Sequence, residues 1–336
     1  MQDSFQIKAE DWHSFLLDLS GDNTVYVPVK TFKNLDYKIF TKEIENIVYN
    51  VAKPVTPLKN FFLPVKENVF NEKKNNNKQI IIGIPSCDLK ALEILDEIYL
   101  DNRYPDPFYK DRRKRSVLIG NDCFKISDHC HCNSYGIEPY PVEHADASLS
   151  QIDNTIIVSI NTEKGKELLN QASAKYQVQE PQAEILKIVQ ERRNEIKKQL
   201  TVINKTLPDY KTTGELIKKS DDDIWIKHSR TCVSCGACAV ICPTCTCFLL
   251  IDRPDFEKVR QVDACQYPGF ERIAAGEDPL HKRFVRFRNR YLCKYVWKTE
   301  SFNSIACTGC GRCIESCIGN ISKNEIFIEM NTAAQP

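Results

Sequence analysis

The sequence predicts a mixed α/β region in the N-terminal two thirds of the chain, followed by a smaller, mainly α-helical and cysteine-rich domain. β-Branched runs alternate with amphipathic helical stretches up to about residue 200, a pattern typical of α/β folds. Beyond them, one cysteine spacing occurs twice between Cys232 and Cys317. The acidic triplet 221–223 before Trp225 marks a boundary, so we expect domains at residues 1–225 and 226–336.

Apolar periodicity predicts the elements of the α/β region. We expect strands at 24–29, 80–84, 117–119 and 156–160, and helices directly after Pro85, at 164–170 and after Pro181. In the helix after Pro85, leucines and an isoleucine recur on one face, which places Cys87 at the N-terminal mouth of that helix. Residues 71–79 (NEKKNNNKQ) have nothing to bury, so they predict an exposed loop.

The two cysteine motifs have the spacing C-x2-C-x2-C-x3-C. The first comprises Cys232, Cys235, Cys238 and Cys242, and the second comprises Cys307, Cys310, Cys313 and Cys317. In this spacing three thiolates bind one cubane cluster and the fourth binds the other cluster. We therefore expect a dicluster, ferredoxin-like domain with crossed ligand sets. The first set is Cys232, Cys235, Cys238 and Cys317, and the second set is Cys307, Cys310, Cys313 and Cys242. The motif favours 4Fe-4S clusters over structural zinc, which usually takes two separated C-x2-C pairs.

A third set of cysteines lies in the α/β region and comprises Cys87, Cys123, Cys130 and Cys132. Strand ends and a loop are expected to bring these thiols together above the sheet. The dipole of the helix that begins near Cys87 favours a thiolate there, as ligation of a third cluster requires. Two alternatives stay open. The run from His129 to Cys132 offers the mixed ligands of a zinc site, and free cysteines are often buried simply as small hydrophobic residues.

A fourth set comprises Cys245, Cys247, Cys265 and Cys293. Like the third set, it contains one C-x-C pair and two single cysteines, and it completes a division of the 16 cysteines into four groups of four. A fourth cluster is one interpretation. The other is that Cys245 and Cys247 pack beside the ferredoxin-type clusters and tune their reduction potentials.

Composition favours a cytoplasmic protein with reduced thiols. The N-terminus has no secretory signal pattern, so disulfide bonds are not expected despite the many cysteines. The most apolar run, 239–251, is too short to span a membrane and contains Pro243. A net charge of +1 gives no general attraction to nucleic acid, although four arginines alternate with aromatic residues between 283 and 291. We expect those arginines to stabilise reduced clusters instead.

Nucleotide-binding and nickel-binding patterns are absent from the sequence. There is no G-x-G-x-x-G after a predicted strand, no G-x4-G-K-S/T, and no C-x2-C pair near each terminus of the kind that a nickel-iron centre needs. The chain therefore has the features of an electron relay, and we expect no catalytic residues in it.

Six further segments, taken together, resemble a known family. They are GIPSCDLKALEILDEIYLD (83–101), DPFYKDRR (106–113), HCHCN (129–133), CPTCTCF (242–248), DACQYPGF (263–270) and FRNRYLCK (287–294). This series resembles the beta subunits of soluble NAD(P)-linked nickel-iron hydrogenases, or sulfhydrogenases, from about Phe61 to Asn320. The A subunit of anaerobic sulfite reductase is similar over the same span. One departure is Ile318, where relatives usually carry proline, but Ile318 is not a ligand.

The resemblance implies an electron-transfer subunit that sits between a flavin subunit using NAD(P)H and a catalytic subunit. Cys293 is typical of the hydrogenase branch, whereas the sulfite reductase branch tends to carry histidine there. Since both residue types bind metals, this alternation favours a ligand role for Cys293. We expect a relay in a cytoplasmic hydrogenase; the alternatives are a relay in an anaerobic sulfite reductase and a cluster-bearing protein that binds clusters or senses redox state without relaying electrons.

Overall fold

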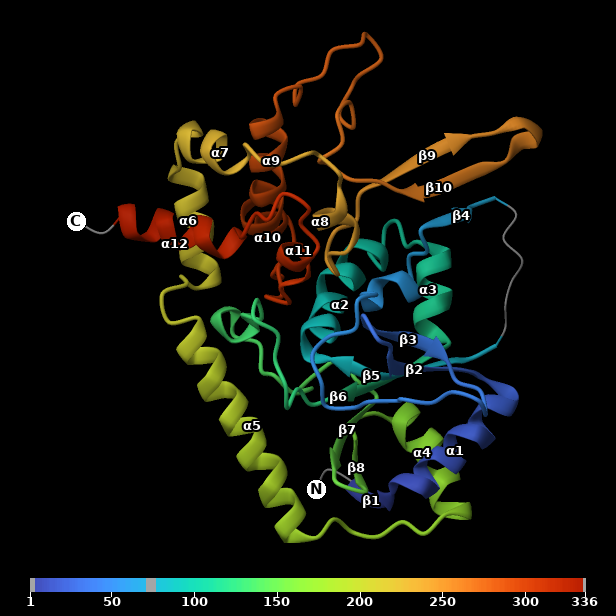
Figure 1. The fold of residues 1–336 in the computed structure, drawn as a ribbon. Coiled ribbons are helices and arrows are strands. Elements are labelled where there is room, and N and C mark those ends of the chain that lie inside the picture. The colour runs from blue at the N-terminus through green and yellow to red at the C-terminus, as the bar shows by residue number, and fades with distance from the viewer. Residues whose placement is uncertain (1–3, 71–76, 335–336) are drawn as a thin grey trace.

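The computed structural model describes residues 4–70 and 77–334, and Figure 1 shows how their helices and strands are arranged. The loop predicted at 71–79 therefore falls largely outside the described residues. A seven-stranded sheet forms the centre of the N-terminal region, with strand order β1-β8-β7-β6-β5-β2-β3. Its strands are β1 (Ser4–Lys8), β2 (Thr24–Lys30), β3 (Leu35–Ile39), β5 (Gln79–Pro85), β6 (Ser116–Asn121), β7 (Ala147–Ile152) and β8 (Thr155–Ile160).

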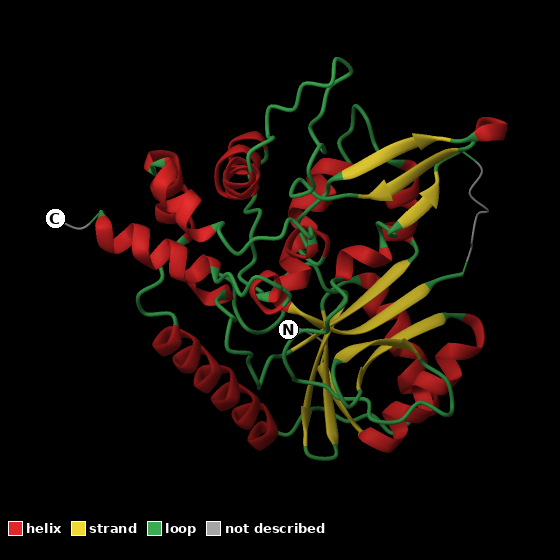
Figure 2. Cartoon of the chain, turned by 45° about the horizontal axis from the view of Figure 1, so that its top comes forward, coloured by secondary structure: helices red, strands yellow, loops and turns green. Residues whose placement is uncertain are grey.

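The four inner strands β2, β5, β6 and β7 pair in parallel, and the outer strands pair antiparallel. All seven residues of β5 are buried because helices cover both faces of the sheet. Helices α1 (Ala9–Asp22) and α4 (Glu163–Lys175) pack on one face, against Ile80 and Ile82. Helices α2 (Ser86–Tyr99) and α3 (Pro107–Lys114) pack on the other face, against Ile81. The layered arrangement is visible in Figure 2 and confirms the predicted α/β region.

A long helix, α5 (Ala183–Ile203), leads from this region to the C-terminal part of the chain. The helices there are α6 (Tyr210–Lys219), α7 (Asp222–His228), α8 (Ala237–Val240), α9 (Arg283–Leu292), α10 (Lys298–Ser301), α11 (Arg312–Glu315) and α12 (Lys323–Ala333). Short 3-10 turns occur at Leu58–Phe61, Cys132–Tyr135 and Pro254–Phe256. Between α9 and α10 the helix widens into a π-helical turn, Cys293–Trp297, a feature often found at functional sites.

Aromatic side chains fill the core of the C-terminal part. Trp225, Phe287, Tyr291, Tyr295 and Phe327 are all buried in one cluster. Helices α6 and α7 contribute to this cluster although both precede residue 230. The boundary expected after residue 225 stays a prediction.

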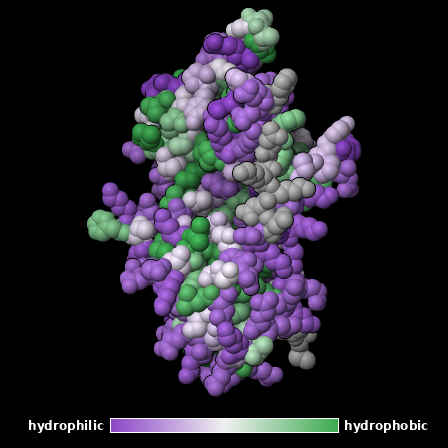
Figure 3. All heavy atoms as spheres, turned by 90° about the vertical axis from the view of Figure 1, so that its right-hand side faces the viewer, coloured by the Kyte–Doolittle hydropathy of each residue, from purple (hydrophilic) through white to green (hydrophobic). Residues whose placement is uncertain are grey.

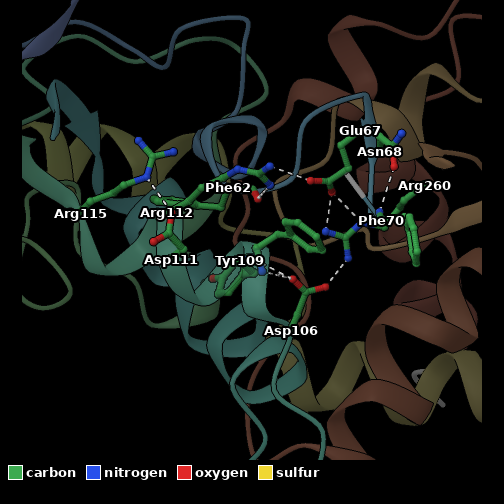
Figure 4. Close-up of polar contacts among 11 residues, drawn as sticks. Phe62, Glu67, Asn68, Phe70, Asp106, Tyr109, Asp111, Arg112, Arg115 and Arg260 are labelled. Atoms are coloured by element: carbon green, nitrogen blue, oxygen red, sulfur yellow. Dashed lines mark hydrogen bonds and ion pairs between the residues drawn. The ribbon is translucent and has the colours of Figure 1, made fainter. Parts of the chain in front are cut away.

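A second, three-stranded sheet joins the two parts of the chain. It pairs β4 (Lys66–Asn68) with β10 (Lys258–Val262), and β10 with β9 (Phe248–Asp252). Buried charges hold this sheet against α3 (Figure 4): Glu67 accepts hydrogen bonds from Arg112 Nη2 at 2.6 Å and from Arg260 Nε at 2.7 Å. Arg260 also pairs with Asp106, the residue that caps α3. The position of the β9–β10 hairpin is thus fixed by the N-terminal region.

Within the described ranges, no helix combines the length and the apolar character needed to cross a membrane.

Candidate metal centres

The topology of the large sheet brings the third cysteine set together. Cys87 follows β5 and Cys123 follows β6, and these neighbouring strands are parallel. Their carboxyl ends therefore meet at one edge of the sheet, the usual position of sites in open α/β folds. The loop with residues 129–132 (the HCHC loop) closes over that edge, and all four cysteines line one cavity, called the third cavity because it belongs to the third set. Four thiols around one space form a suitable donor set for a cubane cluster, and this ligation stays a prediction.

Burial determines the charge state at this edge. Burial raises the pKa of Cys87 well above its usual value, and the neighbouring Asp88 carboxylate adds to the shift. The dipole of α2 therefore does not by itself produce a thiolate at Cys87. A thiolate at Cys87 would require the compensating charge of a bound metal, as expected for ligands buried in a core.

The histidines of the HCHC loop do not line this cavity. His131 is fully buried, and its Nδ1 lies 2.7 Å from the carbonyl oxygen of His129. Its Nε2 lies 2.8 Å from Lys323 Nζ and accepts a hydrogen bond from it. Both ring nitrogens are thus engaged, which favours the all-cysteine set over a mixed zinc site.

Two separate cavities accommodate the paired motifs. Cys232, Cys235, Cys238 and Cys317 line the first cavity, together with Cys313. Cys242, Cys307, Cys310 and Cys313 line the second. In each case the fourth cysteine of one motif lies with the three leading cysteines of the other. This grouping supports crossed ligation, which stays a prediction, and places Cys313 in the wall between the two cavities.

The fourth set is brought together in part. Cys245 and Cys247 line a cavity at the base of the β9–β10 hairpin. A hydrogen bond from Cys265 lowers the pKa of Cys247 to about 6. Cys293, at the start of the π-helical turn, does not line that cavity, but its thiol and that of Cys245 both act electrostatically on the Lys298 amino group. Three thiols of this set are therefore close neighbours, and Cys293 is the outlying member.

Buried cations accompany the cysteine cavities. Lys294 is 3 % exposed, and its Nζ lies 3.0 Å from Cys242 Sγ. Burial alone would lower the pKa of Lys294, but its electrostatic interactions with the facing sulfur atoms of Cys242 and Cys245 raise it well above its usual value. Lys53 Nζ lies 3.7 Å from Cys130 Sγ, and Lys59 donates to the carbonyl oxygen of Cys245 at 3.0 Å.

Lys294 tests whether the cavities fit clusters, whereas Lys53 already pairs with the Glu315 carboxylate at 2.7 Å. An uncompensated charge in a protein interior is strongly unfavourable, so a buried ammonium group requires negative charge nearby. Among the described residues, Lys294 has no carboxylate partner; its other acceptors are the Thr244 hydroxyl at 2.7 Å and the Ala306 carbonyl oxygen at 3.0 Å. Thiolate-ligated clusters carry the negative charge that is required. The residues present therefore fit 4Fe-4S clusters.

The arginines expected beside the clusters differ in how close they lie to the cavities. Arg290 lies in the walls of the first and second cavities, and its Nη2 donates to the carbonyl oxygen of Cys238 at 3.1 Å. Arg286 reaches only Ser234 in the first motif, at 3.4 Å. Arg288 pairs with Asp222 away from the cavities. The lysines were not predicted, because a lysine in sequence is ordinarily an exposed residue.

The second motif packs directly against the HCHC loop. The His131 amide donates to the carbonyl oxygen of Gly309 at 2.9 Å. Gly309 has a φ of +66°, and a Cβ there would lie 2.6 Å from the backbone of His131 and Cys132. Only glycine allows this approach. Gly309 and Cys310 consequently complete the wall of the third cavity.

Comparison with known proteins agrees with these sites. Residues 231–321 match the family described as "4Fe-4S dicluster domain". The whole chain is similar to "Sulfhydrogenase 2 subunit beta" of Pyrococcus furiosus, with 28% identity over 340 residues that cover 97% of each chain. The resemblance inferred from the sequence is thereby confirmed, as is the helical dicluster domain at the C-terminal end. The chain is an iron-sulfur protein related along nearly its whole length to a sulfhydrogenase beta subunit, and it carries a domain for at least two 4Fe-4S clusters.

Proposed function

We propose that this chain is the iron-sulfur electron-transfer subunit of a cytoplasmic nickel-iron hydrogenase, relaying electrons between a subunit that binds flavin and NAD(P) and a catalytic subunit. The observation that carries the proposal is that neighbouring cysteine cavities share walls. Cys310 lines both the third and the second cavity, and Cys313 lines both the second and the first. Adjacent sites of this kind suit the passage of single electrons.

The role of the protein is to hold, shield and electrostatically balance these centres. When bound, 4Fe-4S clusters take up and release electrons one at a time, whereas flavins exchange pairs with NAD(P)H. The chain's own residues provide the thiol ligands and the buried cations, and the aromatic core keeps water away. Tyr291 and Phe287 line the first cavity, and Tyr295 lines the second.

The surface near the fourth set supports an association with other subunits. The β9–β10 hairpin projects from the rest of the molecule, and β9 is an edge strand of its sheet. Phe248, Leu249 and Leu250 are 39, 43 and 55% exposed on that edge. Figure 3 views the side from which the hairpin projects and shows apolar residues among a mostly hydrophilic surface. An exposed apolar edge strand is unfavourable in an isolated chain, and a partner subunit would cover it.

The test is to assay the isolated chain and the intact native complex for hydrogen oxidation and for sulfite reduction, with NAD(P) or an artificial dye. The proposal predicts no turnover by the isolated chain and NAD(P)-linked hydrogen oxidation by the complex. Turnover by the isolated chain would contradict a relay. Sulfite reduction without hydrogen oxidation would assign the chain to the sulfite reductase branch. Clusters that do not undergo reversible reduction would favour a structural or sensing role.

A further inference from the structure

Lys323, the first residue of α12, lies between the cysteine sites although no cysteine motif includes it. Its side chain lines both the first and the second cavity. It is 3% exposed, and it lies in an aromatic surround: Nζ is 5.2 Å from the ring centre of Phe327, 5.4 Å from that of Tyr135 and 5.8 Å from that of Tyr295. Aromatic faces stabilise a cation but provide no full negative charge.

The hydrogen bonds of Lys323 also lack a carboxylate. Its Nζ donates to His131 Nε2 at 2.8 Å and to the Tyr295 hydroxyl at 3.1 Å, and no ion pair involves it within the part of the chain that the structure describes. The negative charge that balances this ammonium group must therefore come from thiolate-ligated clusters in the adjoining cysteine cavities.

Arg290, on helix α9, lies beside the same two cavities. It is 3% exposed, lines the same two cavities, and has a buried Nε with no hydrogen-bond partner among the described atoms. Lys294 differs from both. It lines the second cavity and not the first, and its Nζ contacts Cys242. The chain thus presents two shared cations and one that serves a single cavity.

We propose that Lys323 and Arg290 are shared counter-charges that raise the reduction potentials of the clusters in the first and second cavities together, whereas Lys294 acts on the second of these two clusters and not on the first. This inference rests on the proposed function, because it requires a reducible cluster in each cavity. One-electron reduction adds one negative charge to a cluster. A fixed positive charge beside it therefore favours the reduced state, and the effect is strong in a buried, low-dielectric site.

The experiment is a potentiometric titration of the anaerobic holoprotein, with electron paramagnetic resonance as the readout, in wild type and in Lys323→Met, Arg290→Met and Lys294→Met. We expect both signals of the dicluster domain to shift in Lys323→Met and Arg290→Met. At the wild-type midpoint, the ratio of reduced to oxidised cluster should fall at least tenfold, equivalent to about 59 mV for one electron. In Lys294→Met only one signal should shift, which assigns it to the second cavity.

Controls separate charge from packing. Lys323→Arg and Arg290→Lys keep the charge and should restore both potentials to within a small fraction of the methionine shift. Lys175→Met removes a cation that pairs with Asp18 on the surface and should leave both signals in place. Iron content per chain is measured for each variant. Since Lys323 and Arg290 lie on different helices, a folding defect in one variant leaves the inference tested by the other.

The outcomes are distinguishable. A wild-type protein without two reversibly reducible clusters would contradict the proposed function itself. Two normal clusters in the wild type, with a shift of one signal or of neither in the iron-replete Lys323 and Arg290 variants, would overturn the shared role and leave the relay proposal standing.

Discussion

Asp88 and Arg312 form a buried, two-pronged ion pair across 224 positions of sequence, with oxygen–nitrogen distances of 2.5 and 2.8 Å. Asp88 follows Cys87 of the third set, and Arg312 lies between Cys310 and Cys313 of the second motif. Both side chains are almost completely buried. The pair therefore fixes the third cavity relative to the dicluster domain.

Breaking this pair is expected to be costly. Asp88→Asn leaves the buried Arg312 guanidinium without its carboxylate partner, so we expect the free energy of unfolding to fall by about 3–5 kcal/mol. Urea unfolding of the anaerobic holoprotein measures the change. Asp18→Asn is the matched control, because it breaks the exposed Lys175 pair with the same substitution and should have no measurable effect. Equal effects of the two substitutions would contradict the structural role of the buried pair.

Crossed ligation predicts which cluster is damaged by each fourth cysteine. Cys317→Ser should damage the cluster held by Cys232, Cys235 and Cys238, because these four thiols line the first cavity. Cys242→Ser should damage the other cluster of the pair. Electron paramagnetic resonance of the reduced protein, with iron analysis, distinguishes the two. Loss of the cluster held by Cys307, Cys310 and Cys313 in Cys317→Ser would show that the ligation is not crossed.

The number of clusters is measurable by iron and acid-labile sulfide analysis of the pure chain. With four irons per cubane, about eight of each per chain means the ferredoxin pair alone, about twelve adds one cluster, and about sixteen fills all four sets. We expect at least twelve, because the third set lines one cavity completely. Zinc in the preparation would support the alternative for the third set.

Cys293 decides between the two interpretations of the fourth set. If sixteen irons are found, Cys293→Ala should remove about four of them, whereas a packing role would leave the iron content unchanged. Thr299→Ala, six residues further along the same helical stretch, is the control and should retain all the iron.

Gly309 gives a prediction about backbone contact. Gly309→Ala should disrupt the third cavity, because the added methyl group would lie 2.6 Å from backbone atoms of His131 and Cys132. Loss of iron and a lower melting temperature are the expected results. Gly136→Ala separates conformation from collision, since Gly136 also has a positive φ, +73°, but nothing within 4 Å of an added Cβ. It should cost only about 1–2 kcal/mol and retain the iron. If both variants retain iron equally, the contact is unimportant.

The sequence predicted those parts of the fold that depend on local pattern. The strands β2, β5, β6 and β8 and the helices α2, α4 and α5 appear where apolar periodicity places them. Strand β7 was not predicted, because its sequence ASLSQI alternates with small polar residues instead of branched ones. Strand β9 lies at the end of the apolar run 239–251, from which no strand is predicted. Its pairing with β10 depends on contacts between residues that are not neighbours in sequence, and apolar periodicity does not predict such contacts.

The cysteine sets could be predicted from spacing, whereas their electrostatic surroundings could not. Lys53 and Lys59 reach the cysteines from a segment far away in sequence, and only the fold brings them there. The position of Lys323 beside the cysteine cavities likewise depends on the fold. The convergence of Cys87 with Cys123 is predictable in part, because both cysteines follow predicted strands. That these two strands are parallel neighbours is shown by the structure.

The contact between Gly309 and the HCHC loop has a consequence for biosynthesis. The third set is translated well before the residues that close its cavity, Gly309 and Cys310. Until then these thiols face solvent on the nascent chain, open to iron delivery and equally to oxidation. Docking of the second motif closes the cavity, so a cluster bound by the third set would have to be loaded before this docking or together with it.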